Sequence, residues 1–292
     1  MNTFTIKDLE NLSGIKAHTI RIWEQRYNFL RPNRTGTNIR YYCNEELKTV
    51  LNISLLNRYG YKISHIDKMT EDDLRQKIVS LTLSEARQER LVNELIGQMI
   101  DLDFGQFEDT LDDHIRLRGI DKTIIQLIFP FLDRIGVLWQ SNHIHPVQEH
   151  LVTNIIRQKL IAGIESSSTP VQLNKTVLLF LPEGEYHELG LLYVYYLLKN
   201  RGVKPIYLGA NIPLKDLAFI CEHKKPDYLY THLTCIAGSF HFEKFLEMVH
   251  RLMPATPFVI SGRLARTPLQ KVPPAIHLKK SLSEVMEYIS NI

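Results

Sequence analysis

A histidine between two carboxylates carries the most specific chemistry in this 292-residue chain. Glu185, His187 and Gly190 form the pattern Glu-x-His-x-x-Gly. Neutral imidazole is a good ligand for a transition metal, and a nearby carboxylate can hold the other ring N–H and fix the tautomer. A glycine leaves room for a close backbone approach. Taken alone, the same residues fit equally well with an ordinary loop histidine near a helix N-terminus, where acidic residues are favoured.

The surrounding sequence predicts where this histidine lies. An apolar run at 176–181 predicts a buried strand, and Pro182 and Gly184 end it. A second apolar run at 191–198 predicts a buried helix. The histidine therefore lies in a strand-to-helix loop, and in a doubly wound sheet such loops lie at the edge where ligands bind.

The C-terminal part alternates strands and helices. This rhythm predicts a parallel sheet with helices on both faces, in a Rossmann-like α/β domain over residues 172–292. A Ser- and Pro-containing linker at 166–170 precedes it. The strands are expected at 176–181, 204–208, 228–233, 257–261 and 276–279, and the helices at 188–200, 213–222, 239–252 and 281–290.

The middle part, residues 76–166, is expected to be a helical bundle. Residues 71–90 are polar and helical in pattern, and we interpret them as a linker that passes into a helix. Few helix breakers follow before Ile164, and Pro130 and Pro146 suit helix starts. About four helices fit this length.

The N-terminal part, residues 1–75, predicts a DNA-binding fold. A short helix with Thr5 as its N-cap, a Ser-Gly turn and a second helix over 16–27 make a helix-turn-helix, whose second helix would enter the major groove. Trp23 is expected in the core of this fold, and Glu24 in an internal pair. Residues 32–42 predict a basic wing, and Asn44 caps a helix that runs to about Arg58.

The distribution of charge suggests a basic, nucleic-acid-binding N-terminal part followed by a neutral-to-acidic remainder. Residues 1–62 hold ten Lys/Arg and five Asp/Glu, a net charge of +5 in a chain whose total is +3. Three widely spaced cysteines suggest neither a disulfide framework nor a zinc site. No apolar run reaches transmembrane length and no signal peptide is evident, so we expect a cytoplasmic protein that does not bind a membrane.

The N-terminal 70 residues resemble the MerR-type winged helix-turn-helix. The similarity rests on Ser13-Gly14, on residues 19–27 (Thr-Ile-Arg-x-Trp-Glu-x-Arg-Tyr) and on Arg40-Tyr41-Tyr42. It implies double-stranded operator DNA as a partner. The residues expected to contact DNA are Arg21, Arg34 and Arg40, followed by Thr19, Arg26 and Tyr41.

Two further patterns resemble cobalamin-binding proteins. Glu-x-His-x-x-Gly is similar to the signature of Rossmann-like cobalamin domains, which implies that His187 is the lower cobalt ligand. Trp139, nine residues and then Glu149-His150 resemble the helical cap of light-responsive, adenosylcobalamin-dependent MerR-type repressors, which implies that these three residues lie over the upper face of the cofactor.

Weaker similarities complete the implied site. Thr231-His232-Leu233 stands where cobalamin domains have Ser-x-Leu, and Ser261-Gly262 stands where they have Gly-Gly. Both positions lie near the nucleotide tail of the cofactor in that family. Ordinary loop chemistry explains Thr231 and Ser261 equally well. The resemblance thus implies ten cofactor-binding residues: Trp139, Glu149, His150, Glu185, His187, Gly190, Thr231, Leu233, Ser261 and Gly262.

One position departs from the family pattern. Gln140 stands where well-studied members have a histidine that takes the upper cobalt position after photolysis, and an amide is a poor cobalt ligand beside imidazole. His143 and His145 lie close in sequence and are possible substitutes. The sequence therefore leaves open which upper ligand follows illumination.

The resemblance implies a transcriptional repressor that is not an enzyme. Bound adenosylcobalamin would favour a homotetramer that holds its operator, and light would release it. The alternative is a related regulator that binds another form of cobalamin, or that works as an apoprotein controlled by a partner protein. A corrinoid carrier for methyl transfer is a third class, and the DNA-binding head argues against it.

Overall fold

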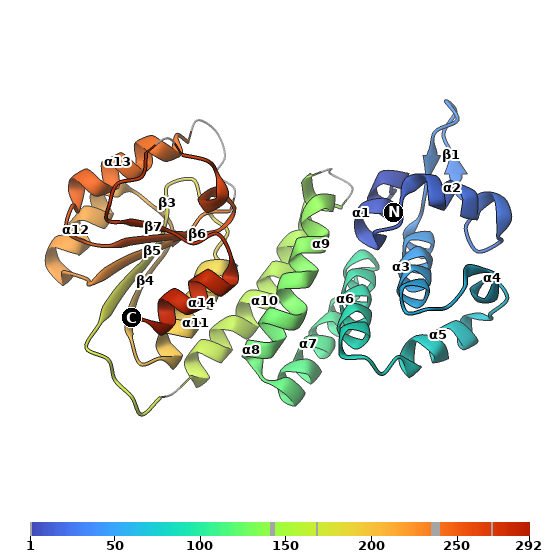
Figure 1. Cartoon of the computed structure of the whole chain (residues 1–292), viewed down its shortest axis with the longest axis horizontal. Helices are drawn as coiled ribbons and strands as arrows, with labels where there is room; N and C mark the ends of the chain where they lie inside the picture. Colours follow the sequence, from blue (N-terminus) through green and yellow to red (C-terminus); the bar gives the residue numbers. More distant parts are fainter. Residues whose placement is uncertain (1, 141–143, 168, 235–239, 270) are drawn as a thin grey trace. The chain divides into compact units, whose positions relative to one another are not determined.

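The computed structural model describes residues 2–140, 144–167, 169–234, 240–269 and 271–292 (Figure 1). It divides into two compact units, Met1–Ile156 and Arg157–Ile292. The predicted division into three domains is finer than this and stays a prediction. Over these described ranges, no helix is long and apolar enough to cross a membrane.

The first unit begins with a winged helix-turn-helix, as predicted. Its elements are α1 (Ile6–Ser13), α2 (Ala17–Arg26), the two-stranded wing of β1 (Asn33–Arg34) and β2 (Arg40–Tyr41), α3 (Asn44–Arg58) and α4 (Ile63–Ile66). Thr5 forms the expected N-cap, because its hydroxyl accepts a hydrogen bond from the amide of Asp8. Gly14 ends α1 at φ 76°, a conformation that favours glycine. Trp23 is buried in the core of this fold, as expected.

The wing is fixed to the second helix of the motif by Glu24. Its carboxylate accepts a hydrogen bond from Arg40 Nε at 2.7 Å and another from the hydroxyl of Tyr42. The Glu24 side chain is only 7% exposed, so water competes little with these bonds. The internal pair predicted for Glu24 is confirmed, and burial together with Glu24 raises the pKa of Tyr42.

Glu24→Ala is expected to destabilise the wing by about 2 kcal/mol, because it leaves a buried hydroxyl and a partly buried guanidinium without their acceptor. The measurement is hydrogen exchange of the amides in residues 33–42 of the full chain, which should speed up about 30-fold. Asp113→Asn is the control, since it breaks an exposed ion pair to Arg116 of the same 2.7 Å length and should leave this exchange unchanged. An unchanged rate in Glu24→Ala would show that the wing is held by other contacts.

The expected linker after the head is instead a helix. Residues Glu71–Ser80 form α5, capped by Thr70, whose hydroxyl accepts from the amide of Asp73. The prediction was wrong because a mostly polar helix needs only a narrow apolar stripe. Ile78 supplies that stripe by packing into the head core beside Trp23 and Ile53.

Four helical segments then form the predicted bundle. They are α6 (Ser84–Ile100), α7 (Phe104–Arg118), a continuous run of α8 (Ile120–Thr123), the π-helical η1 (Ile124–Ile128) and α9 (Phe129–Gln140), and finally α10 (Pro146–Ser166). Pro146 starts α10, as expected, whereas Pro130 lies inside the continuous helical run, just after the π-helical segment, and does not start a helix. Phe107 of α7 and Phe131 of α9 meet edge to face in the bundle core, with ring centroids 5.3 Å apart.

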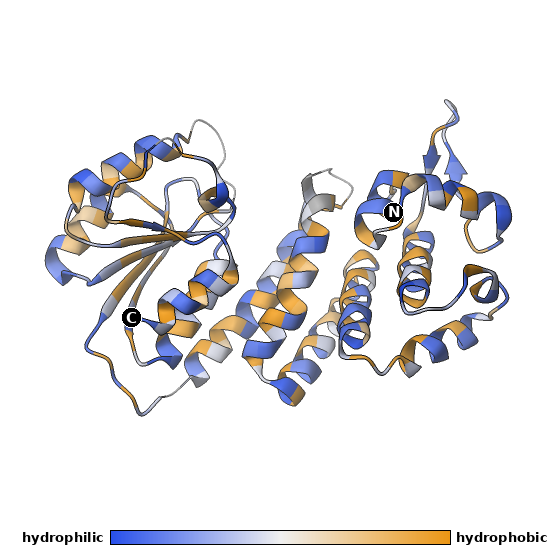
Figure 2. Cartoon of the chain, in the orientation of Figure 1, coloured by the Kyte–Doolittle hydropathy of each residue, from blue (hydrophilic) through white to orange (hydrophobic). Residues whose placement is uncertain are grey.

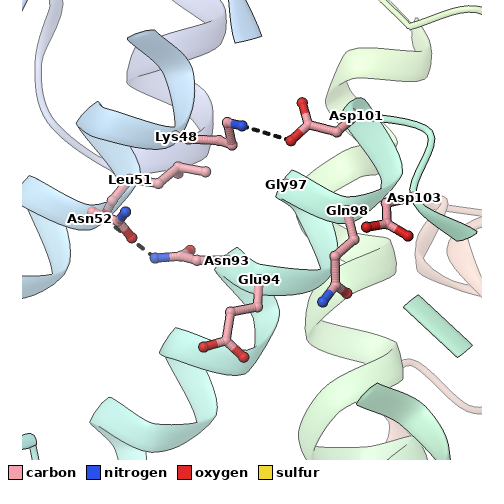
Figure 3. Close-up of a pocket in the computed structure, with 9 residues that line it drawn as sticks. All are labelled: Lys48, Leu51, Asn52, Asn93, Glu94, Gly97, Gln98, Asp101 and Asp103. Carbon is pink, nitrogen blue, oxygen red and sulfur yellow. Dashed lines mark hydrogen bonds and ion pairs between the residues drawn. The ribbon is translucent and has the colours of Figure 1, made fainter. Parts of the chain in front are cut away.

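Polar contacts join the head to the bundle. Glu89 of α6 accepts from Arg58 of α3 at 2.7 Å and from Arg134 of α9 at 3.2 Å. Lys48 of α3 pairs with Asp101 at the end of α6 at 2.6 Å (Figure 3). The Lys48–Asp101 pair lines a pocket between α3 and α6, and Figure 3 labels the residues around it. The head is therefore held to α6 by polar contacts from α3 near both ends of this helix.

The second unit contains an α/β fold of the predicted kind, together with the second half of α10. Its parallel sheet has the order β4-β3-β5-β6-β7, and the direction of strand order changes between β3 and β5. The strands are β3 (Thr176–Pro182), β4 (Lys204–Ile212), β5 (Tyr228–His232), β6 (Phe258–Ser261) and β7 (Ile276–Leu278). Ligands bind doubly wound sheets outside the carboxyl ends of the strands at such a switch point.

Helices cover both faces of this sheet (Figure 1). One face packs on α11 (Leu189–Asn200) and α14 (Leu282–Ser290) through residues such as Val194 and Val285. The other packs on α12 (Leu214–Lys224) and α13 (Phe242–Leu252) through residues such as Leu217 and Phe245. Figure 2 shows these helices with mixed polar and apolar faces on an apolar sheet. The buried strands fix the loops at their carboxyl ends.

Candidate functional site

A fully buried carboxylate organises the loop after β3. Glu185 Oε1 accepts hydrogen bonds from the backbone amides of Tyr186 and His187, at 2.9 and 3.0 Å, and Oε2 accepts from the amide of Thr234 at 2.9 Å. Glu185 is 0% exposed, so these donors replace the water that a buried carboxylate loses. The loop is thereby tied across the switch point to the end of β5.

The same carboxylate orients the imidazole of His187. Its Nδ1 lies 2.5 Å from Glu185 Oε1, so Nδ1 carries the proton that is donated to the carboxylate. This tautomer leaves Nε2 as the nitrogen that would bind a metal. The ring is about half exposed, at 51%, on a loop that is otherwise anchored in the sheet. The structure therefore brings together the predicted Glu185 and His187 in the geometry that a metal-binding histidine requires.

The chemistry of the donor set limits the kind of metal. Within the described residues, no group of three His, Cys, Asp or Glu side chains is arranged to hold a metal ion. A metal at His187 would thus need to bring its other ligands with it, as a metal in a macrocycle does. A single oriented imidazole fits the axial position of such a group.

The predicted residues at the carboxyl ends of β5 and β6 have different surroundings. Thr231 is completely buried, and its hydroxyl has no hydrogen-bond partner among the described residues. An orphaned buried hydroxyl is rare, and it fits a site that a polar ligand group completes. The Leu233 side chain instead packs into the apolar core on the α12–α13 side of the sheet.

Ser261 belongs to a buried polar chain that the sequence did not reveal. Its hydroxyl accepts from the Tyr230 hydroxyl at 2.6 Å and lies 2.8 Å from Nδ1 of His232. Burial lowers the pKa of His232 to about 4, so the ring is neutral and Nδ1 can accept from Ser261. Only the alternation of side chains along β5 could have indicated this, because Tyr230 and His232 share the face opposite Thr231.

Both predicted glycines have a structural reason within the protein. A Cβ on Gly190 would lie 2.4 Å from the ring of His232, which packs against the start of α11. A Cβ on Gly262 would lie 2.4 Å from the carbonyl oxygen of Leu233, and Gly262 has a φ of 92°. These positions therefore favour glycine before any ligand is considered.

The predicted cap residues lie at the end of α9 and the start of α10, in the other unit. Trp139 is partly exposed, yet its indole Nε1 is buried without a hydrogen-bond partner among the described residues. Glu149 and His150 lie in the first turns of α10, flanked by the exposed apolar side chains Val147 and Leu151. His145 is exposed just before this helix. His143, the other suggested substitute ligand, lies outside the described residues.

The predicted DNA-binding residues gather on α2 and the wing. Arg21 and Arg26 of α2 are exposed, and Thr19 is partly buried. Arg34 of β1 is exposed and donates to the side chain of Asn38 at the tip of the wing, at 2.8 Å. Arg40 is committed to Glu24, and Tyr41 is partly buried beside it. The most available cations are thus Arg21, Arg26 and Arg34.

Comparisons with known proteins match the DNA-binding head and the helical bundle. Residues 4–73 match the MerR HTH family regulatory proteins, and residues 85–162 match the B12 binding domain. The second match covers the helical bundle with Trp139, Glu149 and His150. The structure of the monomethylamine corrinoid protein of Methanosarcina barkeri aligns with 70% of this chain and 100% of its own at a TM-score of 0.53 and 10% identity, which shows a shared fold.

These findings define the class: a MerR-type transcriptional regulator that carries a B12-binding domain. Two relatives from Myxococcus xanthus make this more particular. The chain is 27% identical to the HTH-type transcriptional repressor CarA over 272 residues, which is 92% of this chain and 90% of CarA. It is 26% identical to the HTH-type transcriptional repressor CarH over 273 residues, which is 91% and 90%. The chain is a repressor of the CarA/CarH type, a regulator rather than an enzyme.

Proposed function

We propose that this repressor binds adenosylcobalamin and that His187 Nε2 is the lower ligand of its cobalt. The observation that carries this proposal is the buried Glu185 carboxylate, which holds Nδ1 of His187 and two loop amides. Such a partner fixes the tautomer and raises the basicity of the ligand nitrogen. The buried hydroxyl of Thr231 has no hydrogen-bond partner among the described residues, which supports a polar ligand group beside this loop.

The upper face of the cofactor would be covered by the helical cap. Trp139 would shield the adenosyl group, with Glu149 and His150 of α10 holding it. The indole N–H of Trp139 has no acceptor within the described part of the chain, which supports this role, because a buried donor of this kind gains a hydrogen bond when a ligand supplies an acceptor. The exposed Val147 and Leu151 would gain an apolar contact in the same step.

Light would act through the cofactor. Bound adenosylcobalamin supplies a cobalt–carbon bond that visible light breaks. The protein responds only if Trp139 and the α10 residues stabilise the assembled, DNA-binding form more with the intact cofactor than with its photoproduct. We propose that this form is a homotetramer in the cytoplasm, in which several heads on one operator strengthen individually weak contacts.

Operator binding would use α2 and the wing. Arg21→Ala is expected to weaken binding to the operator by about 10- to 100-fold if this residue reads a base edge, and Arg34→Ala should lower the salt dependence of binding by about one phosphate contact. The measurement is a titration of promoter DNA at several salt concentrations. Lys204→Ala, at the exposed start of β4, is the control. Equal affinity for Arg21→Ala and wild type would remove α2 as the recognition helix.

A second candidate function follows from His232. Its ring fills the space against Gly190, and the hydroxyl of Ser261 is already engaged by Tyr230 and His232. A nucleotide tail beside these residues would require His232 to move. This favours, as the alternative, a repressor that takes another form of cobalamin or that works as an apoprotein under the control of a partner protein.

One experiment separates these functions. Protein mixed with adenosylcobalamin in the dark is passed through a desalting column, and the promoter fragment is then titrated before and after green light. The proposal predicts a coloured protein and weaker DNA binding after illumination. A colourless protein that binds DNA equally in both conditions would favour the apoprotein. A coloured protein with unchanged DNA binding would support the cofactor site and refute the proposed response to light.

A further inference from the structure

Glu188, next to the proposed cobalt ligand, contacts two other elements of the protein. Neither contact is needed to bind a metal or to start helix α11. Its Oε2 lies 3.2 Å from Arg157 Nη2 of α10, and its Oε1 accepts from the Tyr207 hydroxyl of β4 at 2.9 Å. The carboxylate is only 19% exposed, whereas the Arg157 side chain is 40% exposed. One side chain therefore links the His187 loop to a helix and to a strand.

Because of these contacts, the Glu188 carboxylate does not cap the N-terminus of α11. Glu188 is the N-cap of α11, where an acidic side chain ordinarily accepts from the amides of the first helical turn, yet it makes no such bond. Tyr207 is held in place by stacking on Tyr195 of α11, at 5.4 Å between ring centroids. Burial and Glu188 both raise the pKa of Tyr207, so its hydroxyl keeps its proton and remains a donor.

The His187 loop is consequently fixed at two points. Glu185 ties its start to the amide of Thr234 after β5, and Glu188 ties its end to Arg157. Arg157 belongs to the same continuous helix, Pro146–Ser166, as Glu149 and His150. His150 precedes Arg157 by seven residues, about two helical turns, so the two lie on a similar side of α10.

The far end of this helix is also tied. In the first turn of α10, the Gln148 amide donates to the carbonyls of Met99 and Ile100 at the end of α6, at 3.0 and 3.4 Å. Asn44 of α3, in the DNA-binding head, donates to the same Ile100 carbonyl at 3.3 Å. A shift of α10 along its axis would therefore disturb contacts of the head.

We propose that Glu188 is a positioning residue: its ion pair with Arg157 makes the His187 loop and α10 move together, so that a displacement of His187 reaches the cap helix. This inference rests on the proposed function, because binding of the cobalt is what would displace His187. The link itself is a property of the protein without cofactor.

The first test uses the cofactor-free full chain. Arg157→Gln and Glu188→Gln are each expected to speed hydrogen exchange of the amides in residues 186–192 about fivefold, since a partly exposed ion pair contributes modestly to local stability. Lys175→Gln is the matched control, because Lys175 and Asp227 form an ion pair of the same 3.2 Å length and similar exposure at the opposite edge of the sheet. Unchanged exchange in both variants would overturn the proposal.

The second test measures coupling during binding. Hydroxocobalamin is titrated into wild type, Arg157→Gln, Glu188→Gln and the double variant, and the absorbance change gives each dissociation constant. Both single variants should bind about two- to fivefold more weakly, and the double variant no more weakly than either one. Losses that multiply in the double variant would contradict a shared role. His187→Ala is run alongside: wild-type affinity in that variant would refute the proposed ligand, while the exchange rates would still decide the link.

Discussion

His187→Ala is expected to weaken the binding of adenosylcobalamin at least about 100-fold, measured by absorbance titration in the dark. Loss of a residue that only supports a metal ligand typically lowers metal affinity 10- to 100-fold, and loss of the ligand itself should cost more. Glu185→Gln tests the loss of the supporting residue. Glutamine keeps the size of the side chain but cannot accept the His187 N–H as strongly as an ionised carboxylate does. It should fall between wild type and His187→Ala.

The control for this experiment is His223→Ala. His223 is exposed on α12 and lies on the ring of Phe219, with centroids 4.2 Å apart, so its removal takes an imidazole from the same unit without touching the β3 loop. It should bind adenosylcobalamin as wild type does. If His187→Ala also keeps wild-type affinity and an unchanged absorption spectrum, the ligand is not His187.

Gly262→Ala is expected to lower the stability of the chain by about 3 kcal/mol or more. The backbone at this position has φ 92° and ψ −171°, a region that is open essentially to glycine alone. The added Cβ would also lie 2.4 Å from the carbonyl oxygen of Leu233. That oxygen accepts a hydrogen bond from the amide of Leu264, which joins the segments that follow β5 and β6. It therefore cannot move freely.

Thermal unfolding of the full chain, followed by circular dichroism, measures this loss as a lower transition temperature or as failure to fold. Gly105→Ala on α7 is the matched substitution, because its Cβ would meet only Asp103 at an ordinary 3.9 Å. It should stabilise the protein slightly, since alanine favours a helix more than glycine does. A Gly262→Ala protein as stable as wild type would show that the backbone after β5 and β6 can shift to accept the added Cβ.

Local sequence patterns predicted much of the fold because local chemistry specifies it. The run at 176–181 became β3, ending at Pro182, since a short continuous apolar stretch bounded by turn residues suits a strand buried on both faces. Thr5 and Gly14 bound α1 through a side-chain cap and a left-handed backbone, both of which depend on single residue types. The pairing of Glu185 with His187 was predictable for the same reason, because the two residues lie in one short loop.

Contacts between distant segments were not predictable in this way. His232 reaches Ser261 across neighbouring strands, and Glu188 reaches Arg157 from a different helix. Neither pair has a fixed sequence spacing, so only the strand order and the helix packing bring them together. The helix α5 was missed because its single buried residue, Ile78, depends on a partner surface elsewhere in the head.

Electron paramagnetic resonance of bound cob(II)alamin tests the central claim most directly. The protein is grown with [15N]histidine and loaded with unlabelled cob(II)alamin, whose unpaired electron couples to the axial nitrogen. Coordination by His187 predicts that the nitrogen splitting changes from a triplet in unlabelled protein to a doublet in labelled protein, and that the doublet is absent in His187→Ala. A triplet in both proteins would mean that the cofactor keeps its own base on cobalt, which would contradict the proposal.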